Sequence, residues 1–183
     1  AFFRVDRSWT EKHLLPLFDW SRPVEAKAVW EGFLWSPRLH QPLLTAFKSQ
    51  FLDSANHYVD LAEHRQQFAA FLTYAALGPT GGYTVDEFRS ALSKLPPDGL
   101  AESAQSFYQA IASSGDQRET YWRNRAQPFW TKIWPKFREL ATPKISEFLT
   151  LAAIAARDEF PAALTEIKDW LKPIDHPYTI IHS

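Results

Sequence analysis

Residues 121–171, YWRNRAQPFWTKIWPKFRELATPKISEFLTLAAIAARDEFPAALTEIKDWL, are the stretch that decides the fold. Four of the chain's eight tryptophans fall in it, and prolines separate its apolar, helix-forming pieces. Apolar residues that recur every three or four positions predict a buried helix face. Two such faces are present. The first requires a helix that continues through Pro128 and is formed by Trp122, Phe129 and Ile133. The second is formed by Trp130, Trp134, Phe137 and Ala141.

These two faces lie close in phase and together cover more than half of the helix circumference. A helix buried to that extent needs neighbours on two sides. Two shorter helices are predicted to follow, because Thr142-Pro143 is an N-cap before proline at the first helical position, and Pro161 lies in a first turn after Asp158. This pattern is typical of stacked helical repeats. It predicts an architecture and requires no particular chemistry.

Signals for the start of a helix recur along the rest of the chain. A capping box places Ser, Thr or Asp three residues before Glu, so that each side chain bonds the other's backbone N–H. The predicted boxes begin at Ser8, Asp60, Thr84 and Asp116.

Proline and glycine mark further helix ends. A helix from Pro23 is expected to bury Val24, Ala28 and either Phe33 or Leu34, and Ser36-Pro37 is expected to start the next one. Gly78 is expected to end a helix, and residues 96–99 (PPDG) to form a turn. These signals give about nine helices. Alternation with a period of two is absent and only residues 178–181 have strand composition, so the chain is predicted to be all-α.

The helices are expected to form one domain, residues 1–183, of stacked hairpins resembling a HEAT-like α-solenoid. Trp30 and Trp35 before one pair of helices echo Trp122 and Trp134 before another, about 90 residues later. This echo suggests two halves, residues 1–78 and 116–174, joined by residues 79–115. The joining segment opens with the loop GPTGG.

Composition excludes several classes of function. The 183 residues carry a formal net charge of −1, so the whole chain has no electrostatic preference for nucleic acid or membrane. The absence of cysteine excludes disulfides, zinc–thiolate sites and thiol nucleophiles. No signal peptide or membrane-length apolar run is present, and a cytoplasmic location is expected. Because the sequence lacks methionine even at position 1, we expect it to be a piece of a longer polypeptide.

One set of residues has spacing suited to a metal. Asp53, His57, Asp60 and His64 would share one face of a continuous helix, and carboxylates with imidazoles can bind a divalent ion. However, the capping box expected at Asp60 would break that face, and the set lacks a metalloenzyme motif such as HExxH. We therefore expect a solvated polar face and no metal.

No catalytic motif accompanies the remaining polar residues. The serines lie outside a nucleophile elbow, and GPTGG lacks the lysine and the preceding strand of a phosphate-binding loop. Asp158 and Glu159 lie where a helix N-terminus favours negative charge. We expect no enzyme activity and no cofactor in this chain.

A local excess of positive charge coincides with the aromatic stretch. Residues 118–144 contain seven basic residues and two acidic ones, a net charge of +5, whereas residues 86–116 contain five acidic and two basic, a net charge of −3. The two segments could face each other, or their charges could simply be solvated. Basic residues among tryptophans are also typical of protein hot spots and of nucleic-acid grooves. The candidate partner-binding residues are Arg123, Arg125, Lys132 and Lys136.

The run FWTKIWPKFRELATPKISEFLTLAAIAARDEFPAALTEIKDWLKPI (residues 129–174), with VWEGFLWSPRL (residues 29–39), resembles an uncharacterised helical domain. That domain lies at the C-terminal end of large bacterial proteins that begin with a sirtuin-like domain. The resemblance covers most of the chain and rests on Trp and Pro at helix corners. It implies an antiphage protein whose N-terminal domain degrades NAD, while the helical remainder senses infection or holds the assembly. The resemblance supplies no functional residue that can be matched here.

Three hypotheses follow from these observations. The first is a non-catalytic interaction, sensor or scaffolding domain that contacts protein, whether the rest of its own polypeptide, an oligomer partner or a phage protein. The second is a nucleic-acid-binding module that uses the basic stretch 118–144. The third is a metal-dependent enzyme built on His57 and His64.

Overall fold

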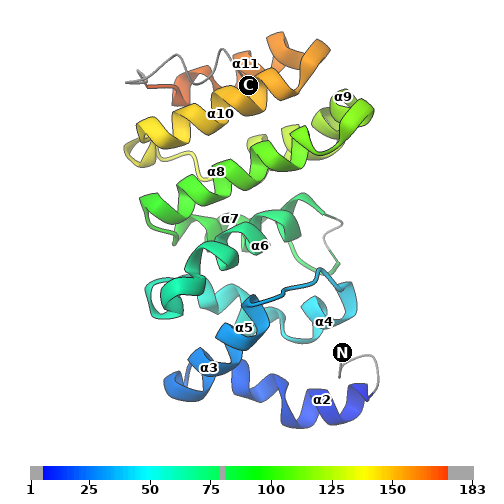
Figure 1. The fold of residues 1–183 in the computed structure, drawn as a ribbon, viewed down its shortest axis with the longest axis vertical. Coiled ribbons are helices and arrows are strands. Elements are labelled where there is room, and N and C mark those ends of the chain that lie inside the picture. The colour runs from blue at the N-terminus through cyan, green and yellow to red at the C-terminus, as the bar shows by residue number, and fades with distance from the viewer. Residues whose placement is uncertain (1–5, 79–80, 173–183) are drawn as a thin grey trace.

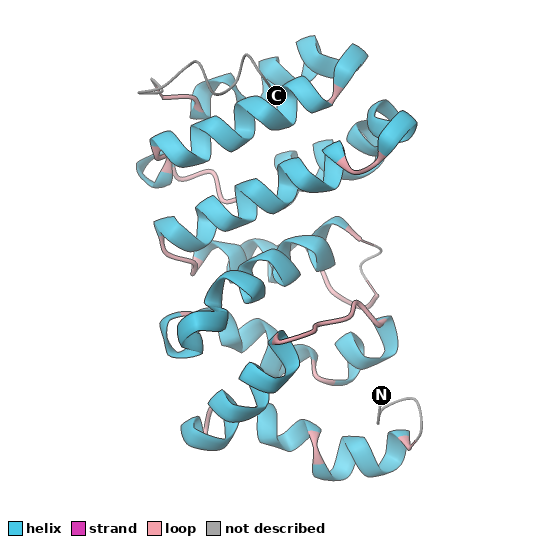
Figure 2. Ribbon diagram, viewed as in Figure 1, coloured by secondary structure: helices cyan, strands magenta, loops and turns pink. Residues whose placement is uncertain are grey.

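A computed structural model describes residues 6–78 and 81–172. Within these ranges the chain is helical and contains no strand, which confirms the all-α prediction (Figure 2). The strand-like residues 178–181 lie outside the described part. The ten α-helices are α2 (Arg7–His13), α3 (Pro23–Leu34), α4 (Gln41–Ala46), α5 (Lys48–Asp53), α6 (Arg65–Leu77), α7 (Val85–Ser93), α8 (Pro97–Ala112), α9 (Arg118–Tyr121), α10 (Pro143–Ala155) and α11 (Phe160–Ile167).

Short helical turns connect these helices. Two of them, η5 and η6, are π-helical, and the others are 3-10 turns. They are η1 (Leu15–Phe18), η2 (Ser54–His57), η3 (Val59–His64), η4 (Gly115–Gln117), η5 (Trp122–Ala126), η6 (Phe129–Ile133), η7 (Arg138–Leu140), η8 (Arg157–Glu159) and η9 (Lys168–Trp170).

The helices are stacked along the long axis of the molecule (Figure 1). Helix α8 packs against α6 on one side and against α10 on the other, and α10 also packs against α11. Residues 79–115, expected to join two halves, therefore contribute α7 and the central helix α8 to the stack. Within the described ranges, no helix is both long and apolar enough to cross a membrane.

Aromatic rings fill the core of the N-terminal part. Trp30 is fully buried, and its ring lies 4.7 Å from that of Phe18, 5.6 Å from that of Phe47 and 6.2 Å from that of Phe68, measured between centroids. The Trp30 indole N–H donates to the Phe18 carbonyl over 3.2 Å, so its one polar atom is satisfied inside the core. Trp30 thus joins α3 to η1 and α6 by edge-to-face contacts, and it stacks on Phe47 just before α5.

The inward face of α3 differs from the expectation. Ala26, Trp30 and Leu34 are buried, whereas Val24 is 82% exposed and Ala28 is exposed. The prediction of Val24 and Ala28 was wrong because Trp30, the largest side chain, sets the phase of the helix. Residues four and eight positions apart from Ala26 then share the buried face.

Three of the predicted helix ends were correct, two at helix starts and one at a helix C-terminus. Thr84 forms both bonds of its capping box, and the side chain of Thr142 accepts a hydrogen bond from the backbone N–H of Ile145 before Pro143. Gly78 is the C-cap of α6.

Other predicted starts were wrong. Asp6, rather than Ser8, caps α2 by accepting from the Trp9 backbone N–H over 2.8 Å. Asp60 lies inside η3, where Ala62 has a φ of 49°, and α6 begins only at Arg65. Asp116 lies in η4 and forms no cap for α9. Residues 96–99 open α8, with Pro97 in its first turn.

The aromatic stretch continues as one helical segment from Arg118 to Ile133, through Pro128. In the two π-helical turns, the N–H of Gln127 donates to the Trp122 carbonyl and that of Trp134 to the Phe129 carbonyl. Proline lacks an N–H and its ring crowds the carbonyl four residues earlier, so a wider π-turn accommodates it without ending the helix. The segment contacts α7 and α8 on one side and η8 on another.

The second predicted face is buried at Trp130, Trp134 and Ala141, and it fails at Phe137. Trp130 and Trp134 are buried, as expected, but Phe137 is 56% exposed. The helix ends at Ile133 because Trp134 precedes Pro135 and adopts ψ of 131°, which is the extended conformation that a following proline favours. Helical spacing therefore no longer places Phe137 over Trp130.

Candidate interaction surface

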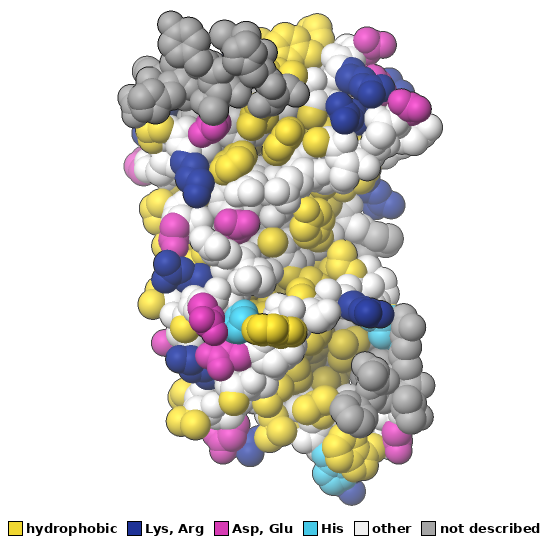
Figure 3. Space-filling view, viewed as in Figure 1, with side chains coloured by type: hydrophobic (Ala, Val, Ile, Leu, Met, Phe, Trp, Pro, Cys, Tyr) yellow, Lys and Arg dark blue, Asp and Glu magenta, His cyan; other side chains and the backbone are white. Residues whose placement is uncertain are grey.

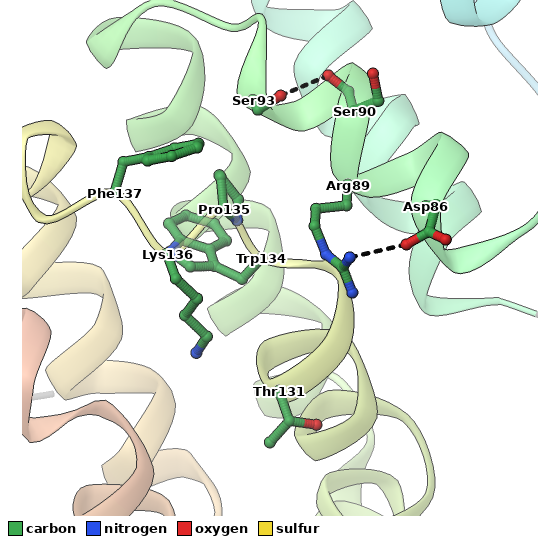
Figure 4. A pocket seen from close by; sticks show the side chains of 9 residues that line it. All are labelled: Asp86, Arg89, Ser90, Ser93, Thr131, Trp134, Pro135, Lys136 and Phe137. Atoms are coloured by element: carbon green, nitrogen blue, oxygen red, sulfur yellow. Dashed lines mark hydrogen bonds and ion pairs between the residues drawn. The ribbon is translucent and has the colours of Figure 1, made fainter.

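A surface groove of about 470 Å³ lies between α7 and the extended segment after η6 (Figure 4). We call it the α7 groove. In Figure 4, Trp134, Pro135 and Phe137 lie across from the side chains of α7. It is lined by Asp86, Arg89, Ser90, Ser93, Thr131, Trp134, Pro135, Lys136 and Phe137.

Arg89 fixes the two walls of the groove relative to each other. Its Nε donates to the Lys132 carbonyl over 2.8 Å, and its Nη2 donates to the same oxygen. Its Nη1 forms an ion pair with Asp86 at 2.8 Å. The Lys132 carbonyl lies in the last turn of η6, where backbone oxygens lack helical partners, so a guanidinium is a favourable cap. This contact holds the segment after the helix beside α7.

A tryptophan cluster supports the groove from below. The rings of Trp130 and Trp134 stack with centroids 5.4 Å apart, and Trp170 meets Trp134 edge-on at 5.9 Å. The Trp130 indole N–H donates to the Glu166 carbonyl over 2.9 Å. The Trp134 indole N–H is buried and has no hydrogen-bond partner within the described residues. The base of the groove is therefore rigid and apolar.

Lys136 and Phe137 form the outer wall. The Lys136 Nζ lies 3.9 Å from the centre of the Trp130 ring, a cation–π contact. Partial burial lowers the pKa of Lys136 to about 8, while the nearby Glu166 carboxylate acts in the opposite direction. The cation–π contact likewise favours the charged amine. The aliphatic part of Lys136 and the ring of Phe137 therefore form a solvent-exposed apolar surface next to the Lys136 amine.

The four predicted partner-binding residues are all exposed, as expected, but they fall into two groups. Arg123 forms an ion pair with Glu159 at 2.6 Å, and Arg125 lines a second, shallower groove of about 370 Å³ with Tyr121 and Asn124. Lys132 and Lys136 lie at the other end of the helical segment. Nine positions along the helical segment separate Arg123 from Lys132, roughly 14 Å at 1.5 Å per residue, and Lys136 lies beyond the end of that segment. The structure thus divides the basic stretch and offers no single array of cations.

Of the four candidate metal ligands, His57 contacts Asp53 and Asp60, and His64 is separate from them. His57 Nδ1 lies 3.0 Å from Asp60 Oδ2, and its Nε2 lies 4.0 Å from Asp53 Oδ2. The His57 ring stacks on Trp20 at 4.4 Å, which accounts for its position without a ligand. His64 is directed elsewhere, toward Trp35. Among the described residues, no group of three or more His, Cys, Asp or Glu could hold a metal ion.

Sequence reasoning missed one residue of the groove and one exposed aromatic residue elsewhere on the molecule. Arg89 was absent because its role depends on a carbonyl 43 positions away in the chain, which no local pattern indicates. Trp35 was assigned only to a helix corner, yet it is 80% exposed. Trp35 keeps helical φ and ψ as the C-cap of α3, and helical phase places it off the face that Trp30 and Leu34 bury. Hydrophobic side chains reach the surface at several places along the stack, with charged side chains between them (Figure 3).

The chain matches no protein-family model, no curated protein and no solved structure.

Proposed function

We propose that this chain is a non-catalytic protein-interaction domain, and that the α7 groove is the surface through which it contacts its partner. The observation that carries the proposal is the exposed Phe137 ring, which lines the groove together with Trp134 and Lys136. Protein interfaces are enriched in aromatic residues placed in or beside a pocket and rimmed by charge. A groove that is open to solvent along its length suits a polypeptide better than a reacting small molecule.

The stack of α6, α8, α10 and α11 supports the further proposal that the domain belongs to the α-solenoids of HEAT type. In that architecture each helix contacts only its neighbours in the stack, and side grooves remain open for partners. The resemblance of residues 29–39 and 129–174 to the helical domain of sirtuin-like antiphage proteins gives the proposal its context. The domain would serve as the sensor or scaffold of a bacterial defence protein that degrades NAD elsewhere in its chain.

The nucleic-acid alternative is less well supported by this geometry. Affinity for nucleic acid increases with the number of phosphates that a continuous basic surface neutralises. Here Arg123 is engaged by Glu159, and the remaining cations lie at opposite ends of the segment.

The test uses the full gene product, expressed with Phe137→Ala or with Lys132→Glu and Lys136→Glu. We expect each variant to remain folded and to lose affinity for its protein partner by at least tenfold, since an aromatic anchor is worth about 2 kcal/mol. Val24→Ala is the control, because Val24 is an exposed apolar side chain on α3 and is not among the residues that line the groove. Wild-type association by all variants would refute the proposal. Salt-dependent binding of a single-stranded DNA 20-mer that is lost in Arg123→Glu and Arg125→Glu would favour the alternative.

A further inference from the structure

The second groove lies along α9 and η5, and we call it the α9 pocket. Its volume of about 370 Å³ lies within the range of pockets that hold small ligands. All the residues that line it have polar side chains, and no carboxylate is among them. They are Ser114, Gln117, Thr120, Tyr121, Asn124 and Arg125. The pocket is therefore a surface of hydroxyl, amide and guanidinium groups.

Helical spacing explains why these side chains share one face and why the neighbouring acids do not join them. Within the helical segment the lining residues occupy positions 117, 120, 121, 124 and 125, the repeat of a single helix face. Glu119 and Arg123 fall on the opposite face, where Glu159 of η8 pairs with Arg123 at 2.6 Å. Asp116 precedes the segment and pairs with Arg157 at 3.6 Å. These negative charges are thus turned away from the pocket or compensated.

Arg125 is the cation of the pocket, and it is not engaged by the protein. Among the described residues it forms neither an ion pair nor a hydrogen bond, in contrast to Arg123 two positions earlier. Burial raises the pKa of Tyr121, and the positive charge of Arg125 acts in the opposite direction. The remaining influence on this phenol comes from Tyr74, which is neutral at pH 7. The charge of Arg125 is therefore felt in the pocket without a carboxylate to cancel it.

The neutral donors beside Arg125 are also unused. Four of the lining side chains form no hydrogen bond with another residue in the described ranges, namely those of Gln117, Thr120, Tyr121 and Asn124. Ser114 differs, because its hydroxyl donates to the Ala110 carbonyl over 2.8 Å. A guanidinium presents a planar fork that binds two oxygens of one oxyanion, and a phosphate group has three such oxygens. One guanidinium with free amide and hydroxyl donors next to it satisfies all three.

We propose that the α9 pocket binds the phosphoryl group of a small phosphate monoester. Arg125 binds two of the phosphate oxygens, the Asn124 amide and the Thr120 hydroxyl donate to the third, and the organic group lies beside the half-buried ring of Tyr121. A carboxylate ligand is bound more weakly, because it offers two oxygens and a single charge. The pocket shares no residue with the α7 groove, so this inference does not rest on the proposed function.

Titration of the isotope-labelled chain, followed by nuclear magnetic resonance of its backbone amides, tests the proposal. The probes are phenyl phosphate and inorganic phosphate, with sodium chloride at equal ionic strength and sodium acetate as comparisons. We expect both phosphate probes to shift the amides of residues 114–125, with a dissociation constant of about 1 mM because the site is open to water. Phenyl phosphate should bind more tightly than inorganic phosphate, since only its ring can contact Tyr121.

The two neighbouring arginines supply a matched pair of variants. Arg125→Ala should weaken binding of phenyl phosphate at least tenfold, whereas Arg123→Ala should change it by less than about twofold, because Glu159 already engages Arg123. Arg125→Lys keeps the charge but loses the planar fork, so it should weaken binding by less than Arg125→Ala does. Asn124→Ala should weaken it about threefold. Circular dichroism melts establish that every variant is folded.

The inference is overturned if neither phosphate probe shifts these amides, or if chloride or acetate shifts them as strongly. It is also overturned if Arg123→Ala weakens binding as much as Arg125→Ala, since the two would then act as a diffuse basic surface. Single-stranded DNA that binds with equal losses in both variants would point to the same conclusion. Each of these failures leaves the proposal for the α7 groove intact, because that groove is tested on other residues.

Discussion

Trp130 and Trp134 stack on each other at the base of the groove, and only one of them has a partner for its indole N–H. Replacing either by alanine removes a nearly fully buried side chain. A tryptophan buries about 200 Å², which at about 25 cal/mol per Å² corresponds to about 5 kcal/mol. Measured truncations of buried aromatics cost about 3–5 kcal/mol, so we expect a loss in this range for each alanine variant.

The phenylalanine variants separate packing from hydrogen bonding. Trp130→Phe loses the bond to the Glu166 carbonyl and weakens the cation–π contact with Lys136. Trp134→Phe removes an N–H that has no partner, and with it a desolvation cost. Since a buried hydrogen bond contributes about 1 kcal/mol net, Trp130→Phe should destabilise the chain by about 1–2 kcal/mol more than Trp134→Phe.

Urea unfolding followed by far-ultraviolet circular dichroism measures both effects, because the helical signal does not depend on the tryptophan removed. With a denaturant slope of about 2 kcal/mol per molar, an alanine variant should unfold at roughly 2 M less urea than the wild type. Equal midpoints for the two phenylalanine variants would refute the role given to the Glu166 contact. Alanine variants that unfold with the wild type would show that the cluster is not part of the core.

Three further outcomes are expected. Thr84→Ala should lose about 1 kcal/mol of stability in the same urea assay, because the Thr84 side chain caps α7. Ser8→Ala should change stability by less than about 0.5 kcal/mol, because Ser8 does not cap α2, and equal losses would contradict this. The pKa of Lys136 is about 8 in the folded chain and 10.5 in the reference state, so between these pH values the unfolded state binds more protons and folding stability rises with pH. The free energy of unfolding of the wild type, measured relative to that of Lys136→Gln, should therefore rise as pH increases from 8 to 10.5. A difference that does not change with pH would exclude the lowered pKa. Elemental analysis of the purified chain should find no stoichiometric divalent ion, and about one zinc or manganese per chain that is lost in His57→Ala would overturn the structural account of that residue.

Helix content and several boundaries could be predicted because they depend on residues close together in sequence. The Thr84 capping box and the Thr142-Pro143 start each need only a four-residue segment. The burial of Trp130 and Trp134 follows from helical spacing over the same segment. Such local patterns predict helix ends and buried faces correctly wherever no tertiary contact favours another conformation.

The failures have tertiary causes. Asp60 has the spacing of a capping box, but its carboxylate contacts His57 instead, and His57 is held by the Trp20 ring far away in sequence. Phe137 was placed on a helix face by its spacing from Trp130 and Trp134, but the helix ends before Trp134-Pro135. A pattern read at 3.6 residues per turn places side chains correctly only as far as the helix extends.

The candidate site was predicted only in part. Lys132 and Lys136 were identified from charge among aromatics. Lys136 lines the groove, and Lys132 contributes the backbone carbonyl that Arg89 binds. Arg123 and Arg125 were grouped with Lys132 and Lys136 because all four are close in sequence. In the structure the two pairs lie at opposite ends of the helical segment. The Arg89 contact that closes the groove joins residues 43 positions apart and has no local signature.

Hydrogen–deuterium exchange on the 183-residue chain, compared alone and with its protein partner bound, tests the central claim most directly. The amides of residues 131–137 and of α7 should exchange more slowly in the complex, because a bound partner covers the groove. Phe137→Ala should abolish that added protection without changing exchange in α8. Unchanged exchange at the groove, with new protection confined to other surfaces, would contradict the account.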